Sequence, residues 1–180
     1  MKRKIKPTVD CVFKAIFGKE ENRNLLINFL NAVLELTEGK RITEVTILNP
    51  YNEREFETGK LSIVDVKAMD QRGRRYQVDV QLAVGPWLSL RMLHNWAAVY
   101  HAQLEKGKRF STLKPLISIW VLDGILFEPE EPDDDDDERD WLHVDFEIWS
   151  RRLEIPMNDH FNIHILQLPY WPRDGRAEND

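Results

Sequence analysis

Two β-rich runs, residues 60–69 and 75–83, are joined by a short polar segment, and this pairing restricts the fold more than any other feature of the sequence. A three-residue loop over residues 71–73 puts Gly73 at the position that needs a left-handed backbone, which glycine adopts at little cost. Asp70 then pairs with Arg74, and each further pair lies one step out from this one. In that register one face of the hairpin is apolar and anchors it to a core: Val64, Val66, Ala68, Tyr76, Val78, Val80 and Leu82.

The opposite face of the hairpin gathers three polar side chains. Because side chains alternate along a strand, Asp65 is expected directly opposite Asp79, with Gln81 on the same face. Two facing carboxylates repel each other, so the pair calls for a cation or a proton. Carboxylates and phosphate oxygens are the usual ligands of Mg²⁺ in proteins, and a metal held in this way assists phosphodiester hydrolysis. The open alternative is a solvated polar surface without a metal.

The remaining periodicity predicts an α/β chain with a central mixed β-sheet flanked by helices. Pro86 opens a helix that should cover one face of the sheet and end near Gly107. Residues 116–122 are almost continuously apolar, which is typical of a central strand. The predicted helices are residues 10–17, 25–36 and 86–107. The predicted strands outside the hairpin are residues 42–48, an edge or first strand, and residues 116–122, 144–149 and 161–168.

Composition limits the classes of protein to which the chain can belong. With 180 residues, of which 42% are hydrophobic, it can bury one sizeable core, and we expect one domain over residues 1–172 and a disordered polar tail over residues 173–180. Cys11 is the only cysteine, which excludes an intrachain disulfide and a cysteine-rich zinc site. No apolar run approaches the roughly 20 residues that span a bilayer, and no apolar segment follows the basic start, so a cytoplasmic location is expected.

The net charge of −6 is distributed unevenly. Residues 1–114 contain 20 Lys and Arg against 13 Asp and Glu, whereas residues 115–180 contain 5 against 18. Much of the second excess lies in residues 128–140, which are expected to form a hydrated acidic loop. A basic surface therefore remains available for nucleic acid. The alternative for the acidic loop is a mimic of DNA that covers this basic surface.

The hairpin residues also carry a family resemblance. Lys60-Leu-Ser-Ile-Val-Asp-Val-Lys-Ala-Met-Asp70 and Tyr76-Gln-Val-Asp-Val-Gln81 resemble the metal-binding hairpin of the recombination-promoting nuclease/putative transposase family, a bacterial branch of the PD-(D/E)XK nucleases. Similarity extends over nearly all of the chain, including residues 10–18, Arg91, Tyr100, Gly107 and residues 114–120. The resemblance implies a restriction-endonuclease-like core and a Mg²⁺-dependent DNA endonuclease, with Mn²⁺ as a substitute, that is associated with DNA recombination and transposition.

The resemblance also implies roles for individual residues. Asp65 and Asp79 would be the metal ligands, and Gln81 would take part in catalysis beside them. The family usually has glutamate where this chain has Asp79, and the shorter side chain withdraws the carboxylate by about one methylene, which would weaken metal binding and activity. Glutamine at position 81 is usual for this branch. Lys67 shares the face of Asp65 and is the candidate for a positive charge at the phosphate.

Further residues remain as candidates with open alternatives. Asp10 either caps its own helix or adds a third acid to the metal site, a role for which Glu35 is the second candidate. Four arginines, three at the hairpin turn and one in the following helix, are candidates for DNA contacts or solvated surface residues: Arg72, Arg74, Arg75 and Arg91. The expected partners are DNA and a second copy in a homodimer, without a membrane. The alternative function is a catalytically impaired nuclease-fold module that binds nucleic acid or protein.

Overall fold

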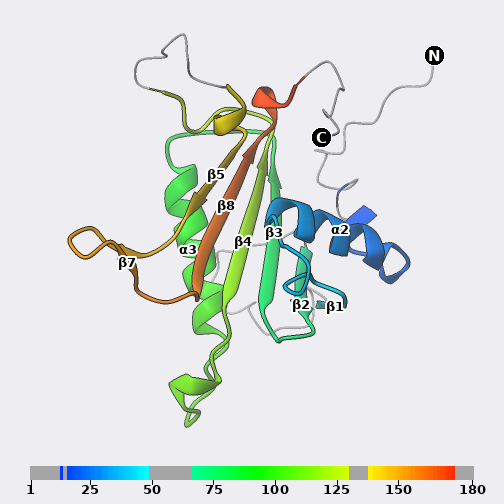
Figure 1. Cartoon of the computed structure of the whole chain (residues 1–180), viewed down its shortest axis with the longest axis vertical. Coiled ribbons are helices and arrows are strands. Elements are labelled where there is room, and N and C mark those ends of the chain that lie inside the picture. Colours follow the sequence, from blue (N-terminus) through cyan, green and yellow to red (C-terminus); the bar gives the residue numbers. More distant parts are fainter. Residues whose placement is uncertain (1–12, 14–15, 49–65, 130–137, 173–180) are drawn as a thin grey trace.

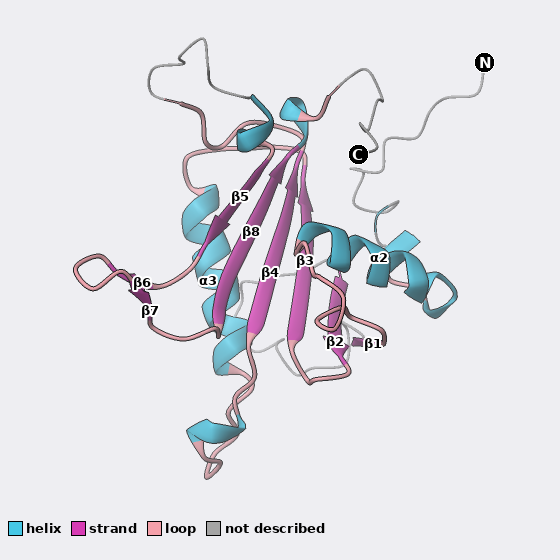
Figure 2. Cartoon of the chain, viewed as in Figure 1, coloured by secondary structure: helices cyan, strands magenta, loops and turns pink. Residues whose placement is uncertain are grey.

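The chain folds around one six-stranded mixed sheet with helices on both faces (Figures 1 and 2). The computed structural model describes residues 13, 16–48, 66–129 and 138–172. The strand order is β1-β2-β3-β4-β8-β5, and a separate pair, β6 and β7, stands apart from this sheet. The predicted α/β class with a central mixed sheet is confirmed. The main elements are α2 (Arg23–Val33), β1 (Val45–Leu48), β2 (Val66–Asp70), β3 (Arg75–Gln81), α3 (Leu88–His101), β4 (Leu116–Leu122), β5 (His143–Phe146), β6 (Trp149–Ser150), β7 (Ile155–Pro156) and β8 (Phe161–Gln167).

Strand β4 forms the centre of the sheet. All seven of its residues are buried, and it pairs in parallel with β3 on one side and β8 on the other. Its side chains alternate between two cores: Ile117, Ile119 and Val121 pack on the side of α2, while Trp120 and Leu122 pack on the side of α3 with Leu88 and Met92. Full burial of each large apolar side chain stabilises the fold by about 1.5–3 kcal/mol. The prediction of a central strand at residues 116–122 is confirmed.

The β2–β3 hairpin has the predicted register. Val66 faces Val78 and Ala68 faces Tyr76, and the N–H of Gly73 donates to the carbonyl of Asp70 at 3.0 Å. Gly73 has a φ of +80°, the left-handed backbone that the three-residue loop requires. One face of the hairpin packs against α2 through Val66, Ala68, Tyr76, Val78 and Val80, as the apolar pattern predicted.

The Asp70 carboxylate holds the hairpin turn together. Its Oδ1 accepts hydrogen bonds from the backbone N–H groups of Arg72 and Arg74, each at 2.9 Å, and its Oδ2 accepts from the Tyr76 hydroxyl at 2.9 Å. Burial, together with the nearby Asp70 carboxylate, raises the pKa of Tyr76 well above its ordinary value. Tyr76 therefore stays protonated and remains a donor to Asp70.

Several elements differ in extent from those expected. Helix α2 ends at Val33 because Glu35 adopts a left-handed backbone, with a φ of 47°, and the N–H of Leu36 closes the helix on the Asn31 carbonyl at 3.2 Å. Helix α3 ends at His101 rather than near Gly107. The expected strand at residues 144–149 is divided into β5, at the edge of the sheet, and β6, which pairs with β7.

Some expectations concern residues outside the described ranges. These are most of the first predicted helix, the start of the first hairpin strand, much of the acidic loop and the C-terminal tail: residues 1–12, 14–15, 49–65, 130–137 and 173–180. The expected division into a domain over residues 1–172 and a disordered tail stays a prediction. Among the described residues, no helix is long and apolar enough to cross a bilayer.

Candidate active site

Asp79 lies in the interior of the sheet, on the face covered by α3. It is 1% exposed and faces Trp120 of β4 across the parallel ladder. Its neighbours Val78 and Val80 point to the α2 core, so alternation along the strand places Asp79 on the opposite side. Gln81, two residues further at the end of β3, shares this face. A carboxylate and an amide therefore lie next to each other in the interior, where burial of a polar group costs stability unless it is compensated.

Helix α3 adds a cation to this face. Arg91 Nη1 donates a hydrogen bond to Gln81 Oε1 at 3.0 Å, and its guanidinium carbon lies 5.8 Å from the ring centroid of Trp120. Arginine presents several donors in a fixed planar fork, which matches the geometry of phosphate oxygens. The structure thus brings together two predicted site residues, Gln81 and Arg91, from elements that are separate in the sequence.

Two buried polar residues that the sequence analysis did not single out continue this polar face. Gln77 Nε2 donates to Ser118 Oγ at 2.7 Å, and Trp120 Nε1 donates to the same oxygen at 2.8 Å. Gln77 and Ser118 are both fully buried. The signal in the sequence was the alternation of Gln77, Asp79 and Gln81 along β3, which places three polar residues on one face of an interior strand.

An acid that was also missed lies at the end of β4. The backbone N–H of Asp123 donates to the Gln81 carbonyl at 2.9 Å, which places Asp123 beside the end of β3. The carboxyl ends of neighbouring parallel strands meet at one edge of an α/β sheet, where ligands commonly bind. An acid directly after the buried run 116–122 was therefore a signal that could have been used.

The predicted metal ligands are described only in part. Asp79 lies in a described strand, whereas Asp65 and Asp10 lie outside the described residues. Lys67 faces Gln77 across the hairpin and is half-buried on the Asp79 face. No group of three His, Cys, Asp or Glu side chains that could hold a metal occurs within the described residues. The carboxylate of Asp79 is nevertheless the hard oxygen donor that Mg²⁺ prefers, so this residue fits a divalent ion.

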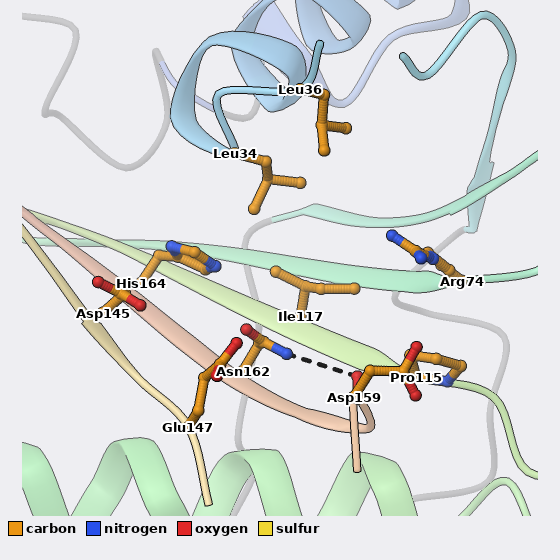
Figure 3. Close-up of a pocket in the computed structure, with 10 residues that line it drawn as sticks. All are labelled: Leu34, Leu36, Arg74, Pro115, Ile117, Asp145, Glu147, Asp159, Asn162 and His164. Atoms are coloured by element: carbon orange, nitrogen blue, oxygen red, sulfur yellow. Dashed lines mark hydrogen bonds between the residues drawn. The ribbon is translucent and has the colours of Figure 1, made fainter. Parts of the chain in front are cut away.

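The candidate DNA-contacting arginines do not form one cluster. Arg91 lies at the site, but the arginines of the turn lie at the opposite end of β3, and Arg75 is four residues, about 13 Å, from Asp79 along the strand. Arg72 donates to the backbone carbonyls of Gly39 at 2.7 Å and Lys40 at 3.4 Å. Arg74 lines a pocket on the α2 face (Figure 3). The turn thus presents these side chains in different directions.

Glu35 does not reach the candidate site. It lies directly after α2 and lines a pocket with His143 and His164, on the α2 face of the sheet. Asp79 lies on the other face, so the structure does not bring Glu35 next to Asp79. The two histidines pair with each other, with His143 Nε2 3.0 Å from His164 Nδ1, and burial followed by the neighbouring His143 lowers the pKa of His164 to about 4.

A hairpin followed by a helix and a parallel strand, with an acid and a glutamine two residues apart on an interior strand, defines an α/β restriction-endonuclease-like protein. The chain belongs to the PD-(D/E)XK nuclease family transposases, whose family profile matches residues 7–179. The family suspected from the hairpin residues is therefore confirmed. No curated protein and no solved structure matches the chain.

Proposed function

We propose that the chain is a metal-dependent DNA endonuclease that acts in DNA recombination or transposition. The observation that carries this proposal is a buried carboxylate on an interior strand, Asp79, on one face with Gln81 and Arg91. Membership of a nuclease family supports the reaction class. The proposed partners are DNA and a second copy of the chain. The proposed catalytic unit is one nuclease-like domain over residues 1–172.

Asp65 and Asp79 would hold the divalent metal, with Mg²⁺ as the proposed ion and Mn²⁺ as a substitute. The described pairs of the hairpin, with Val66 opposite Val78, have the register on which the assignment of Asp65 and Asp79 was based. When bound, the ion would lower the pKa of a water molecule and neutralise charge on the phosphate. Carboxylates suit this task because Mg²⁺ is a hard cation that keeps several waters.

The remaining residues of this face would position the DNA. Arg91 would contact a phosphate oxygen, since its guanidinium has donors beyond the one used for Gln81. The Gln81 amide Nε2 would then be held in a fixed orientation toward a water or a phosphate oxygen, because its Oε1 is engaged by Arg91. Lys67 would supply a further positive charge at the phosphate.

The direct test is nicking of supercoiled plasmid with Mg²⁺, with Mn²⁺ and with a chelator. We expect metal-dependent nicking that is lost in Asp65→Ala and reduced in Lys67→Ala, with both variants folded by circular dichroism. Asp70→Asn is the matched control, because Asp70 is a buried acid of the same hairpin on the other face. Nicking that is equal in Asp65→Ala and the wild type would refute the proposed metal site.

A second candidate function is a nuclease-fold module that binds DNA or protein without cutting. The specific observation in its favour is that access to Asp79 is restricted, because Asp79 has the short side chain of an aspartate and is 1% exposed. This module would bind DNA with a strong salt dependence but would not nick plasmid with either metal. Measurement of binding and nicking on the same preparation separates the two functions.

A further inference from the structure

Residues 148–157, which we call the arm, form a hairpin that projects from the sheet at the β5–β8 edge, away from α2 (Figure 1). The two short strands of the arm pair Trp149 with Pro156 and Ser150 with Ile155, and the N–H of Met157 donates to the Ile148 carbonyl at 2.9 Å. A two-stranded hairpin of this size is marginally stable in water. It therefore gains order when it packs against another surface.

The arm exposes large apolar side chains at unusual density. Five of its ten residues are large, apolar and 41–72% exposed: Ile148, Trp149, Leu153, Ile155 and Met157. Single exposed apolar residues are common, but five of them within one ten-residue hairpin typically mark a surface for another macromolecule. The turn of the arm also carries two neighbouring exposed arginines, Arg151 and Arg152, against one exposed acid, Glu154, so its net charge is positive. The arm thus presents an apolar surface with a basic tip.

A groove of complementary character lies on the α2 face of the same chain. Its first part has a volume of about 280 Å³, and it has apolar walls from Leu34, Leu36 and Ile117 (Figure 3). Since one water occupies about 30 Å³ in the liquid, this space admits whole side chains. A second part of about 430 Å³ is lined in part by the same residues, Leu34, Asp145 and His164, so the two parts are adjacent.

The groove is acidic where the arm is basic. Five carboxylates line its two parts, against one arginine, Arg74: Glu35, Asp140, Asp145, Glu147 and Asp159. Opposite charges on two surfaces steer their encounter and fix their orientation. The acids also select against DNA as the occupant, because phosphates would meet like charge.

We propose that the arm of one chain docks in the groove of a second copy, so that two chains exchange arms in a symmetric homodimer. Glu147, which precedes the arm, and Asp159, which follows it, both line the groove. Each chain therefore carries its basic apolar arm beside its acidic groove, with the arm directed away. A two-fold axis next to the β5–β8 edge of the sheet would place each arm over the groove of the other chain. Such self-complementary contacts are the common form of soluble dimers.

The proposal is tested by a charge exchange followed by analytical ultracentrifugation. One variant reverses the tip, Arg151→Glu with Arg152→Glu. The other reverses the groove, Asp145→Lys with Glu147→Lys and Asp159→Lys, which leaves two carboxylates against four basic side chains. All five substituted side chains are exposed, so the fold is expected to persist. The wild type should sediment as a dimer, and each variant alone should dissociate about tenfold or more readily. An equimolar mixture of the two variants should recover the dimer, because both contacts then join opposite charges.

Lys106→Glu with Lys108→Glu, in the loop between α3 and β4, is the matched control and should leave the dimer unchanged. Trp149→Ser should weaken the dimer through loss of apolar contact without a change of charge. A monomeric wild type, dimers in both charge variants, or a mixture without recovery would each overturn the proposal. The readout is mass in solution, so it is independent of the proposed nuclease activity.

Discussion

Asp70 and Asp79 belong to the same hairpin and are both buried, but they lie on opposite faces of the sheet. Asp70 accepts three hydrogen bonds from the turn and from Tyr76, so its burial is accounted for by the stability of the hairpin. Asp79 lies in the middle of an interior strand, between Gln77 and Gln81 on one face and close to Arg91, the partner of Gln81. We infer that polar groups on the α2 face of the hairpin stabilise the fold, whereas those on the α3 face take part in the proposed DNA cleavage.

The largest expected effect is a loss of nicking in Asp79→Asn without a loss of stability, and the reverse in Asp70→Asn. Loss of a residue that supports a metal ligand typically costs 10–100-fold, so loss of the proposed ligand Asp79 should reduce nicking by at least about 100-fold. The free energy of unfolding should change little, because asparagine has the same shape. Asp70→Asn should lose about 1–2 kcal/mol of stability from weaker hydrogen bonds but retain nicking when folded. The nicking rate and the free energy of unfolding are measured for both variants, by plasmid nicking and by urea unfolding. Equal losses of nicking in the two variants would contradict the proposed difference between the α2 and α3 faces.

A second prediction extends the comparison to another polar group on the α2 face, His164. Because burial lowers its pKa to about 4, the unfolded chain, with an ordinary pKa near 6.5, binds a proton more readily than the folded one. Stability from this group is present above about pH 6.5 and is lost as the pH falls toward 4, by at most about 3 kcal/mol. Urea unfolding across this window should show the loss.

The control for this pH dependence is His164→Gln, which keeps a polar side chain but does not titrate. Its stability should vary less between pH 6.5 and 5 than that of the wild type. His143, 3.0 Å away, and Asp145, opposite His164 on β5, face the same group and act in opposite directions on its pKa. A slope that is unchanged in His164→Gln would assign the pH dependence to other residues.

The sequence predicted those parts of the fold that follow from local pattern. The hairpin register followed from Gly73 and the alternation of apolar residues, and the central place of β4 followed from its unbroken apolar run. The division of residues 144–149 into β5 and the arm was not predictable in this way, because exposed apolar residues such as Ile148 and Trp149 continue the pattern of a buried strand.

The arrangement of the candidate site residues could be predicted where a single strand carries them, but not where several elements meet. The shared face of Asp79 and Gln81 is a property of a single strand, and alternation is sufficient to predict it. Three other contacts depend on how the strands and the helix pack. They are the hydrogen bond of Arg91 with Gln81, that of Gln77 with Ser118, and the placement of Asp123 beside the end of β3. The separation of the arginines at the turn from Asp79 follows from the length of β3.

A third prediction tests whether the α3 face includes Arg91. Arg91→Ala should reduce nicking by about tenfold, as expected for one lost charged contact of roughly 1.4 kcal/mol, while stability changes by less than about 1 kcal/mol because the residue is half-buried. Arg91→Lys should recover part of the rate, since it restores the charge without the planar fork. If Arg91 only packs on Trp120, the alanine variant will instead lose stability with no loss of nicking per folded molecule.

The smallest expected effect concerns the turn that Asp70 holds together. Gly73→Ala should cost about 1 kcal/mol, because a φ of +80° is strained for a residue with a side chain. The added Cβ would meet Lys114 Cε at 3.4 Å, an ordinary contact, so the cost arises from the backbone and not from a clash. Gly107→Ala is the matched control: Gly107 has a similar φ of +86° with no atom near its Cβ, but it lies outside the hairpin. A similar decrease of the thermal unfolding temperature in both variants, with nicking intact in each, would support a purely structural turn. Reduced nicking in Gly73→Ala alone would show that the turn also positions the residues of the α3 face.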